Sequence, residues 1–264
     1  MTDSPYLYMY GIEVIKKIYI NPNLYDIVIL ALKDDKDVSD FLLDVGFNEN
    51  QLIKGDVFKN INLNLANYMQ LRNYKFSLIS KNCAGGLLYH RYGLEFSSPT
   101  INTFFSDEDF YKYVSDIKKY NNSDIVMFGD DRKLNGSEWG NIYGMIDDIK
   151  ILFPHSDSKF SAYEGWMRRK QRISYESIFI LSYADTEDDI NRFSQVSYPG
   201  ICITCINSNI KNTYKPHDIT YNQNYRNVPF SMLNRLASGA LSGIDWISSI
   251  LSHQIVMDHN ILYK

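Results

Sequence analysis

The stretch of residues 76–105 constrains the fold of this chain most, because it holds a strand, a tight glycine turn and a helix in immediate succession. A β-prone run at residues 76–80 leads through the turn at 81–86 into the helix-compatible run 87–90. In an open α/β sheet such a turn lies at the carboxyl end of a strand. The helix N-terminus there presents N–H groups with a partial positive charge. The turn therefore marks a candidate site that favours anions such as phosphate.

Strand and helix patterns alternate along most of the chain, and this alternation indicates the fold class. Short apolar runs typical of buried parallel strands are separated by helical patterns with one apolar face. Repeated β then α predicts a three-layer α/β/α domain with a mostly parallel sheet, in which residues 76–80 form the central strand. The strand patterns lie at residues 27–31, 76–80, 125–128, 149–153, 177–183 and 200–206, and the helical patterns at residues 38–45, 87–90, 110–120, 161–173 and from Thr186 onward.

Three segments differ in character. Residues 1–72 predict a short Rossmann-like N-terminal layer, but they hold no G-x-G-x-x-G fingerprint, so no dinucleotide site is predicted. Residues 73–210 carry the main alternation and are expected to form the α/β core. Residues 211–264 predict a polar linker and a helical tail over residues 230–251. This tail could pack on the core, form a homodimer contact or touch a membrane. The membrane is the least favoured of these, because the polar face carries few cations.

Composition excludes several classes of partner. The 264 residues carry a net charge of −4 and no block of five or six basic residues, so neither nucleic acid nor anionic lipid is indicated. No apolar run approaches the roughly 20 residues that span a bilayer. The N-terminus lacks a signal-peptide pattern, and the three cysteines form no disulfide framework. We therefore expect a reduced, cytoplasmic protein without a transmembrane segment.

Cys83 is the first candidate for chemistry. A thiol at a helix N-terminus has its thiolate stabilised by the helix dipole, and His90 or His155 could act as its base. The alternative is a small packing residue chosen to fit beside two glycines, and the sequence favours this alternative because no histidine adjoins Cys83. Cys202 and Cys205 lie in an alternating apolar run and predict a buried strand rather than a redox or metal site.

His155 and Asp148 are the candidates for a general base, since His155 follows a strand end and Asp148 lies close by in the sequence. A lone histidine is also a common structural hydrogen-bonding residue. Two pairs of adjacent acids, at residues 130–131 and 147–148, could hold a divalent cation that binds a diphosphate. Each pair is equally typical of a surface turn, and we predict no metal site.

A helix over residues 161–173 concentrates cations beside a tryptophan. Its arginines either form a solvated face or turn towards a phosphate or carboxylate, for which their forked donors are suited. We expect one cleft at the strand ends. It would be lined by Asn82, Cys83, Gly85, Gly86, His155 and the helix bearing Trp166, Arg168, Arg169 and Arg172.

These blocks resemble a bacterial family of unknown function, DUF1919, whose members are often labelled exopolysaccharide or capsule biosynthesis proteins. The run at residues 79–86 is similar to the family's I-S-N-N-C-W-G-G, with Lys81 in place of an asparagine and Ala84 in place of the tryptophan. The resemblance implies a setting in surface-glycan assembly and supplies no established reaction. The other matching blocks are residues 92–94, 98–100, Gly144, Asp148, Ile149, Phe153, His155, Trp166, Arg168, Arg169, Arg172 and Ile173.

Three functional hypotheses follow. The leading one is a transferase acting on a nucleotide-activated or phosphate-linked sugar, with the glycine turn and arginines on the diphosphate and His155 or Asp148 as base. The second is a Cys83-dependent acyl or group transferase. The third is a non-catalytic protein that binds a sugar nucleotide or acts as a scaffold for glycan assembly. No motif indicates a particular cofactor.

Overall fold

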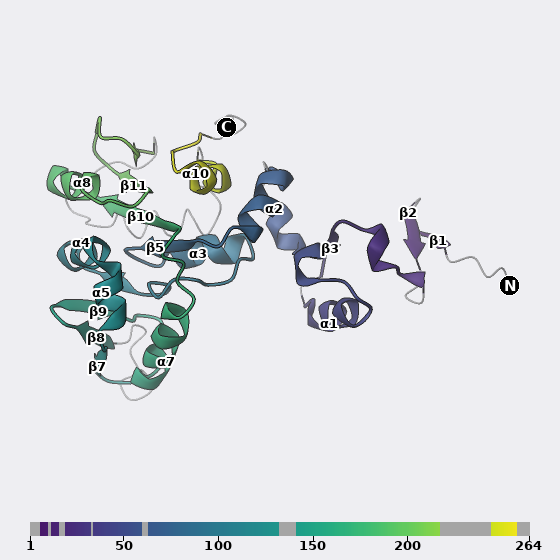
Figure 1. The fold of residues 1–264 in the computed structure, drawn as a ribbon, viewed down its shortest axis with the longest axis horizontal. Coiled ribbons are helices and arrows are strands. Elements are labelled where there is room, and N and C mark those ends of the chain that lie inside the picture. The colour runs from purple at the N-terminus through teal and green to yellow at the C-terminus, as the bar shows by residue number, and fades with distance from the viewer. Residues whose placement is uncertain are drawn as a thin grey trace. The chain divides into compact units, whose positions relative to one another are not determined.

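The computed structural model describes residues 6–9, 12–15, 19–32, 34–59, 63–131, 141–216 and 244–257. The chain divides into two compact units, Met1–Leu63 and Asn64–Lys264. Figure 1 shows the elements of each unit. The division precedes the helix α2 (Leu65–Asn73), which therefore belongs to the second unit.

The first unit is built around one strand–helix–strand motif. Strands β3 (Val28–Leu30) and β4 (Leu52–Lys54) pair in parallel, and α1 (Lys36–Asp44) lies between them in the sequence. The helix pattern at residues 38–45 is followed by Gly46, whose φ of 104° is a left-handed conformation that glycine adopts without strain and that ends the helix. The remaining elements are the hairpin β1 (Tyr6–Met9) and β2 (Ile12–Ile15) and the 3-10 helices η2 (Pro22–Leu24), η3 (Glu49–Gln51) and η4 (Gly55–Lys59).

The second unit contains a four-stranded parallel sheet in the order β12-β11-β10-β5, and the predicted α/β class is confirmed. Helices α3 and α8 follow β5 and β10, as the alternation predicts. The bounds are β5 (Ser77–Ser80), α3 (Ala84–Arg91), β10 (Ile178–Ala184), α8 (Glu187–Ser194), β11 (Gly200–Thr204) and β12 (Thr213–Tyr214).

The strand β5 lies at an edge of this sheet, so the expectation of a central strand is wrong. Its residues are nevertheless all buried, because side chains cover the open edge. The Leu78 N–H donates to the Tyr89 hydroxyl at 2.9 Å, and the Ser80 N–H donates to Thr100 Oγ1 at 3.0 Å. These bonds replace a neighbouring strand, which is why the sequence of an edge strand reads like that of an interior one.

A second, antiparallel sheet with the order β6-β9-β8-β7 was not expected from the sequence. The hairpin β8–β9 turns at Asp147, whose φ of 49° is left-handed. The strands of this sheet and the helices that accompany them in the sequence are β6 (Phe104–Phe105), α4 (Asp107–Ser115), α5 (Ile117–Asn122), β7 (Val126–Phe128), β8 (Tyr143–Ile146), β9 (Ile149–Leu152) and α7 (Lys159–Lys170).

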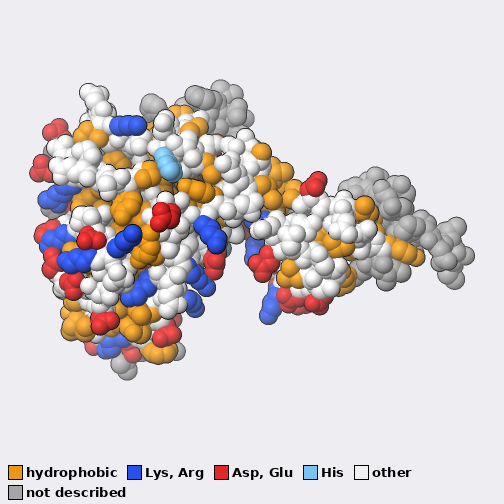
Figure 2. All heavy atoms as spheres, in the orientation of Figure 1, with side chains coloured by type: hydrophobic (Ala, Val, Ile, Leu, Met, Phe, Trp, Pro, Cys, Tyr) orange, Lys and Arg blue, Asp and Glu red, His pale blue; other side chains and the backbone are white. Residues whose placement is uncertain are grey.

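Basic and acidic side chains are interspersed on the visible face of the second unit in Figure 2, so this face carries no patch of one sign.

One hydrophobic core joins the two sheets of the second unit. Ile180 on β10, Ile151 on β9 and Tyr113 on α4 belong to the same buried cluster. Trp166 on α7 completes it, with edge-to-face ring contacts to Tyr113 and Phe153. The core thereby holds the carboxyl end of β5 close to the segment that follows β9.

The C-terminal helix α10 (Trp246–Ser252) packs on α2 within the chain. Asn67 Nδ2 donates to Ser248 Oγ at 2.9 Å across this contact, and Trp246, Ile247 and Ile250 are buried. Most of the predicted tail helix, residues 230–243, lies outside the described residues. In the described part of the chain, no helix has the length and apolar character to cross a bilayer.

Candidate functional site

Cys83 and His155 meet at the carboxyl edge of the parallel sheet. Cys83 is the N-cap residue of α3, three residues after β5 ends, and His155 lies in the turn that follows β9. Cys83 Sγ lies 3.0 Å from His155 Nε2, although 72 positions separate them in the sequence. Cys83 is half-buried and His155 is exposed, so the pair is open to solvent. A thiol and an imidazole at this distance can exchange a proton directly.

The turn that carries Cys83 is held by hydrogen bonds within itself. The Ala84 N–H donates to Asn82 Oδ1 at 2.9 Å, and the Gly85 N–H donates to Ser80 Oγ at 3.0 Å. The Ser80 hydroxyl in turn donates to the Asn82 carbonyl. Two of the helix N–H groups that we expected to bind phosphate are thus already paired. The turn positions Cys83 rather than presenting a fully open anion site.

Burial raises the pKa of the Cys83 thiol to about 11, although the backbone N–H of Cys83 itself lowers it. The thiol is therefore neutral near pH 7, which differs from the thiolate that a helix N-terminus alone would favour. The reason is that desolvation of the charged form outweighs the helix dipole at this position. Proton removal by a neighbouring base becomes necessary for Cys83 to act as a nucleophile.

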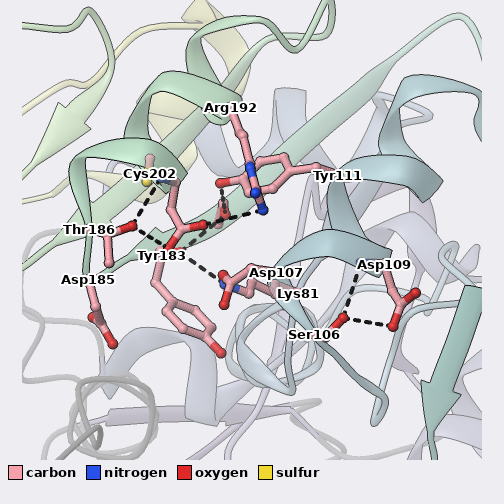
Figure 3. Close-up of polar contacts among 12 residues, drawn as sticks. Lys81, Ser106, Asp107, Asp109, Tyr111, Tyr183, Asp185, Thr186, Arg192 and Cys202 are labelled. Atoms are coloured by element: carbon pink, nitrogen blue, oxygen red, sulfur yellow. Dashed lines mark hydrogen bonds and ion pairs between the residues drawn. The ribbon is translucent and has the colours of Figure 1, made fainter.

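A second polar cluster lies beside the Cys83 turn, at the ends of β5 and β10 (Figure 3). Lys81 is 1% exposed, and its ammonium group forms an ion pair with Asp107 at the start of α4. The Lys81 Nζ also lies 4.0 Å above the Tyr183 ring. Burial lowers the pKa of Lys81 to about 8, although the carboxylates of Asp189 and Asp185 raise it.

Asp185 extends this cluster at the end of β10, where it directly follows the strand. Burial raises the pKa of its carboxyl group, while the positive charge of Lys81 lowers it. The Cys205 thiol donates a weak hydrogen bond of 3.9 Å to Asp185 Oδ1. Sequence reasoning missed Lys81, Asp107 and Asp185, because a buried lysine and its partners carry no spacing signal when tertiary folding brings them together.

Asp148 does not share the site with His155. It lies at the hairpin end of β9, whereas His155 follows the opposite end of the strand. Its Oδ1 accepts a hydrogen bond from the Tyr120 hydroxyl at 2.9 Å, and its Oδ2 is 3.4 Å from Lys112 Nζ. Asp148 therefore connects the β8–β9 hairpin to α4 and α5. In the described ranges no group of three or more His, Cys, Asp and Glu residues is placed to hold a metal ion.

The predicted binding residues on α7, and Arg172 just after its end, lie in different environments. Trp166 is 0% exposed and packs in the core, so its ring offers no surface to a ligand. Arg172 Nη1 is 3.0 Å from Glu95 Oε1, and Arg168 is exposed. Arg169 is half-buried and, unlike Arg172, has no carboxylate partner in the described chain.

The predicted site residue Gly86 is buried in α3, one residue after Gly85.

Two comparisons with known proteins place this geometry in context. The model of a family described as "Domain of unknown function (DUF1919)" matches residues 54–229, a range that contains both Cys83 and His155. A protein of Haemophilus influenzae named "Uncharacterized protein" is 28% identical over 132 residues. That similarity covers 49% of this chain and 61% of the relative, so less than two thirds of the relative's length is matched.

Proposed function

The chain belongs to the DUF1919 family, and we propose that it is a cysteine-dependent acyl transferase with Cys83 as nucleophile and His155 as general base. The observation that carries this proposal is the 3.0 Å approach of Cys83 Sγ to His155 Nε2. Nucleophile and base within hydrogen-bond reach are the signature of covalent catalysis by cysteine. The substrate class is an activated acyl group, such as an ester or thioester.

The first half-reaction forms a thioester. The Cys83 thiol gives its proton to His155 Nε2, which requires the imidazole tautomer with hydrogen on Nδ1. The sulfur attacks the acyl carbonyl carbon, and a C–S bond forms. The bond from that carbon to the leaving group breaks, and the leaving group takes the proton from His155.

The second half-reaction transfers the acyl group to an acceptor. A hydroxyl group of the acceptor gives its proton to His155, and its oxygen attacks the thioester carbon. The C–S bond breaks, and the sulfur recovers the proton from His155. Because burial raises the pKa of Cys83, its thiol is neutral at neutral pH and has to give its proton to a base at each turnover. With water as acceptor, the same steps amount to hydrolysis.

Two features support a site of this kind at this edge. Ser80, Asn82 and Gly85 hold the start of α3 by hydrogen bonds, which fixes the nucleophile in one position. The free state of all three cysteines accords with a reducing, cytoplasmic setting, which we include in the proposal.

The transfer of a nucleotide-activated or phosphate-linked sugar in surface polysaccharide synthesis stays a second candidate. Arg169 favours it, since an arginine without a carboxylate partner suits a phosphate. The paired N–H groups of Ala84 and Gly85 count against a diphosphate at the glycine turn. If neither acyl transfer nor sugar transfer is detected, a non-catalytic scaffold role is the third candidate.

The test of the leading proposal is acylation by p-nitrophenyl acetate at neutral pH, followed by peptide mapping. We expect a thioester on Cys83, accompanied by release of p-nitrophenol. The Cys83→Ala variant should lose this adduct, and His155→Gln should slow its formation by about 10²–10⁴-fold, the usual contribution of a general base.

Cys205→Ala is the matched control, because Cys205 is buried and should not react. The proposal is wrong if Cys83 stays unmodified while the protein is folded. It is also wrong if His155→Gln acylates at the wild-type rate, because the imidazole would then have no part in the reaction.

A further inference from the structure

The side chain of Arg169 is half-buried and has no carboxylate partner in the part of the chain that the structure describes. Its Nε is buried and has no hydrogen-bond acceptor in the described chain, and no carboxylate lies within ion-pair distance of its guanidinium there. A buried charge without a partner costs free energy, because it gives up water and gains nothing in return. Arginine in such a position calls for an anion from outside the chain.

The helix α7 provides space for this guanidinium. Gly165 precedes Arg169 by one helical turn and lies on the same face. A Cβ atom at position 165 would lie 3.2 Å from Arg169 Nη1 and 3.4 Å from Nη2. These distances are tighter than most Cβ contacts, so the glycine leaves room for the guanidinium to lie flat against the helix.

Like charges surround Arg169. Burial, together with the positive charges of Arg168 and Arg172, lowers the pKa of Arg169 to about 10. The guanidinium remains charged at neutral pH. Glu95 neutralises Arg172 alone, at 3.0 Å. The C-terminal end of a helix favours cations, which accounts for an exposed Arg168 but not for the burial of Arg169.

We propose that Arg169, with Arg168 and Arg172 beside it, binds the phosphate group of a small-molecule ligand. Guanidinium groups bind phosphate oxygens through two parallel N–H···O bonds, and the Nε–H of Arg169 donates to no acceptor among the described residues. A phosphate would relieve the repulsion among the three arginines. The inference does not rest on the acyl-transfer proposal, because it concerns other side chains and its test needs no turnover.

The experiment is thermal unfolding of the full chain with increasing inorganic phosphate or pyrophosphate, at an ionic strength held constant with NaCl. We expect a saturable rise in Tm of roughly 5–10 °C once the anion reaches about a hundred times its Kd. Arg169→Met should remove this rise. Without phosphate its Tm should equal or exceed that of the wild type, since the unpaired charge is gone.

Lys119→Gln is the matched control, because Lys119 is an exposed cation on α5 and its loss changes the net charge equally. This variant should keep the full phosphate response. The proposal is overturned if the wild type shows no saturable rise, or if Arg169→Met shows the same rise.

A second variant covers the case in which Arg169→Met does not fold. Gly165→Ala keeps all three arginines and places a methyl group 3.2 Å from Arg169 Nη1, so the guanidinium has to shift. It should raise the phosphate concentration at half-maximal shift by about tenfold or more. An unchanged midpoint would overturn the proposed site as well.

Discussion

At the residue scale, Cys83 shows how burial and chemistry compete. The helix N-terminus favours the thiolate, but desolvation raises the pKa of the thiol to about 11 from its ordinary value of 9.0. His155 Nε2, at 3.0 Å, offers a different route to activation by accepting the proton during attack. The Cys–His contact therefore makes Cys83 a plausible nucleophile without making it an acidic thiol.

This argument predicts the pH dependence of alkylation. Iodoacetamide should label Cys83 slowly at pH 7, and the rate should rise about tenfold per pH unit up to pH 10. The labelling rate of a free cysteine levels off near its ordinary pKa of 9.0. Mass spectrometry of the labelled peptide measures the rate, with urea-unfolded protein as the reference. A plateau at or below pH 8 would mean a preformed thiolate and would contradict the raised pKa.

The raised pKa of Cys83 also makes the stability of the folded protein depend on pH. The unfolded thiol begins to ionise near pH 9.0, whereas the folded thiol keeps its proton until about pH 11. The contribution of Cys83 to folding is thus fully present below pH 9 and is lost as the pH rises to 11.

At the element scale, the close approach of β5 and α3 depends on Gly85. A Cβ atom at position 85 would lie 2.9 Å from Ser80 Oγ and 3.1 Å from Ser80 Cβ. The hydroxyl of Ser80 cannot move away without breaking its bonds to the Gly85 N–H and the Asn82 carbonyl. This contact is the physical reason for glycine in the turn.

Gly85→Ala should therefore lower the free energy of unfolding by about 1–3 kcal/mol, the usual cost of overpacking. Gly86→Ala is the matched control on the same helix, because both changes gain the same helix propensity. At Gly86 the nearest atoms belong to the side chains of Ile101 and Asn102, at 3.1 and 3.2 Å. Urea unfolding measures both variants. Equal costs would show that the contact with Ser80 is unimportant.

At the scale of the whole molecule, each unit contains a hydrophobic cluster among its described residues. The core of the second unit joins its two sheets, whereas Leu30, Leu42, Phe47 and Leu52 form a cluster of their own in the first unit. The first helix of the second unit, α2, belongs to that unit through its contact with α10.

Residues 64–264 should thus unfold cooperatively as an isolated fragment. A fragment of residues 74–264 is the control, because it lacks α2, whose Tyr68 and Leu71 are 1% exposed. We expect the shorter fragment to lose several kcal/mol of stability or to fail to fold. Circular dichroism with thermal unfolding distinguishes the two. Equal behaviour of the fragments would move the boundary to residue 72, where the sequence alone suggests it.

The sequence by itself determined the order and type of the main strands and helices in the parallel part of the chain. It also determined the strand–glycine–helix turn at Cys83 and the stop of α1 at Gly46. These features follow from local causes, namely apolar periodicity, capping and turn chemistry. The α/β class followed from the alternation of these elements.

Only the tertiary structure decided what depends on contacts between distant segments. It placed β5 at a sheet edge, formed the antiparallel sheet and brought His155 to Cys83 from 72 positions away. It also buried Trp166 in the core and left Arg169 Nε without a hydrogen-bond acceptor among the residues that the structure describes. Strand order, burial and side-chain approach are set by packing across the whole unit, and no local pattern in the sequence encodes them.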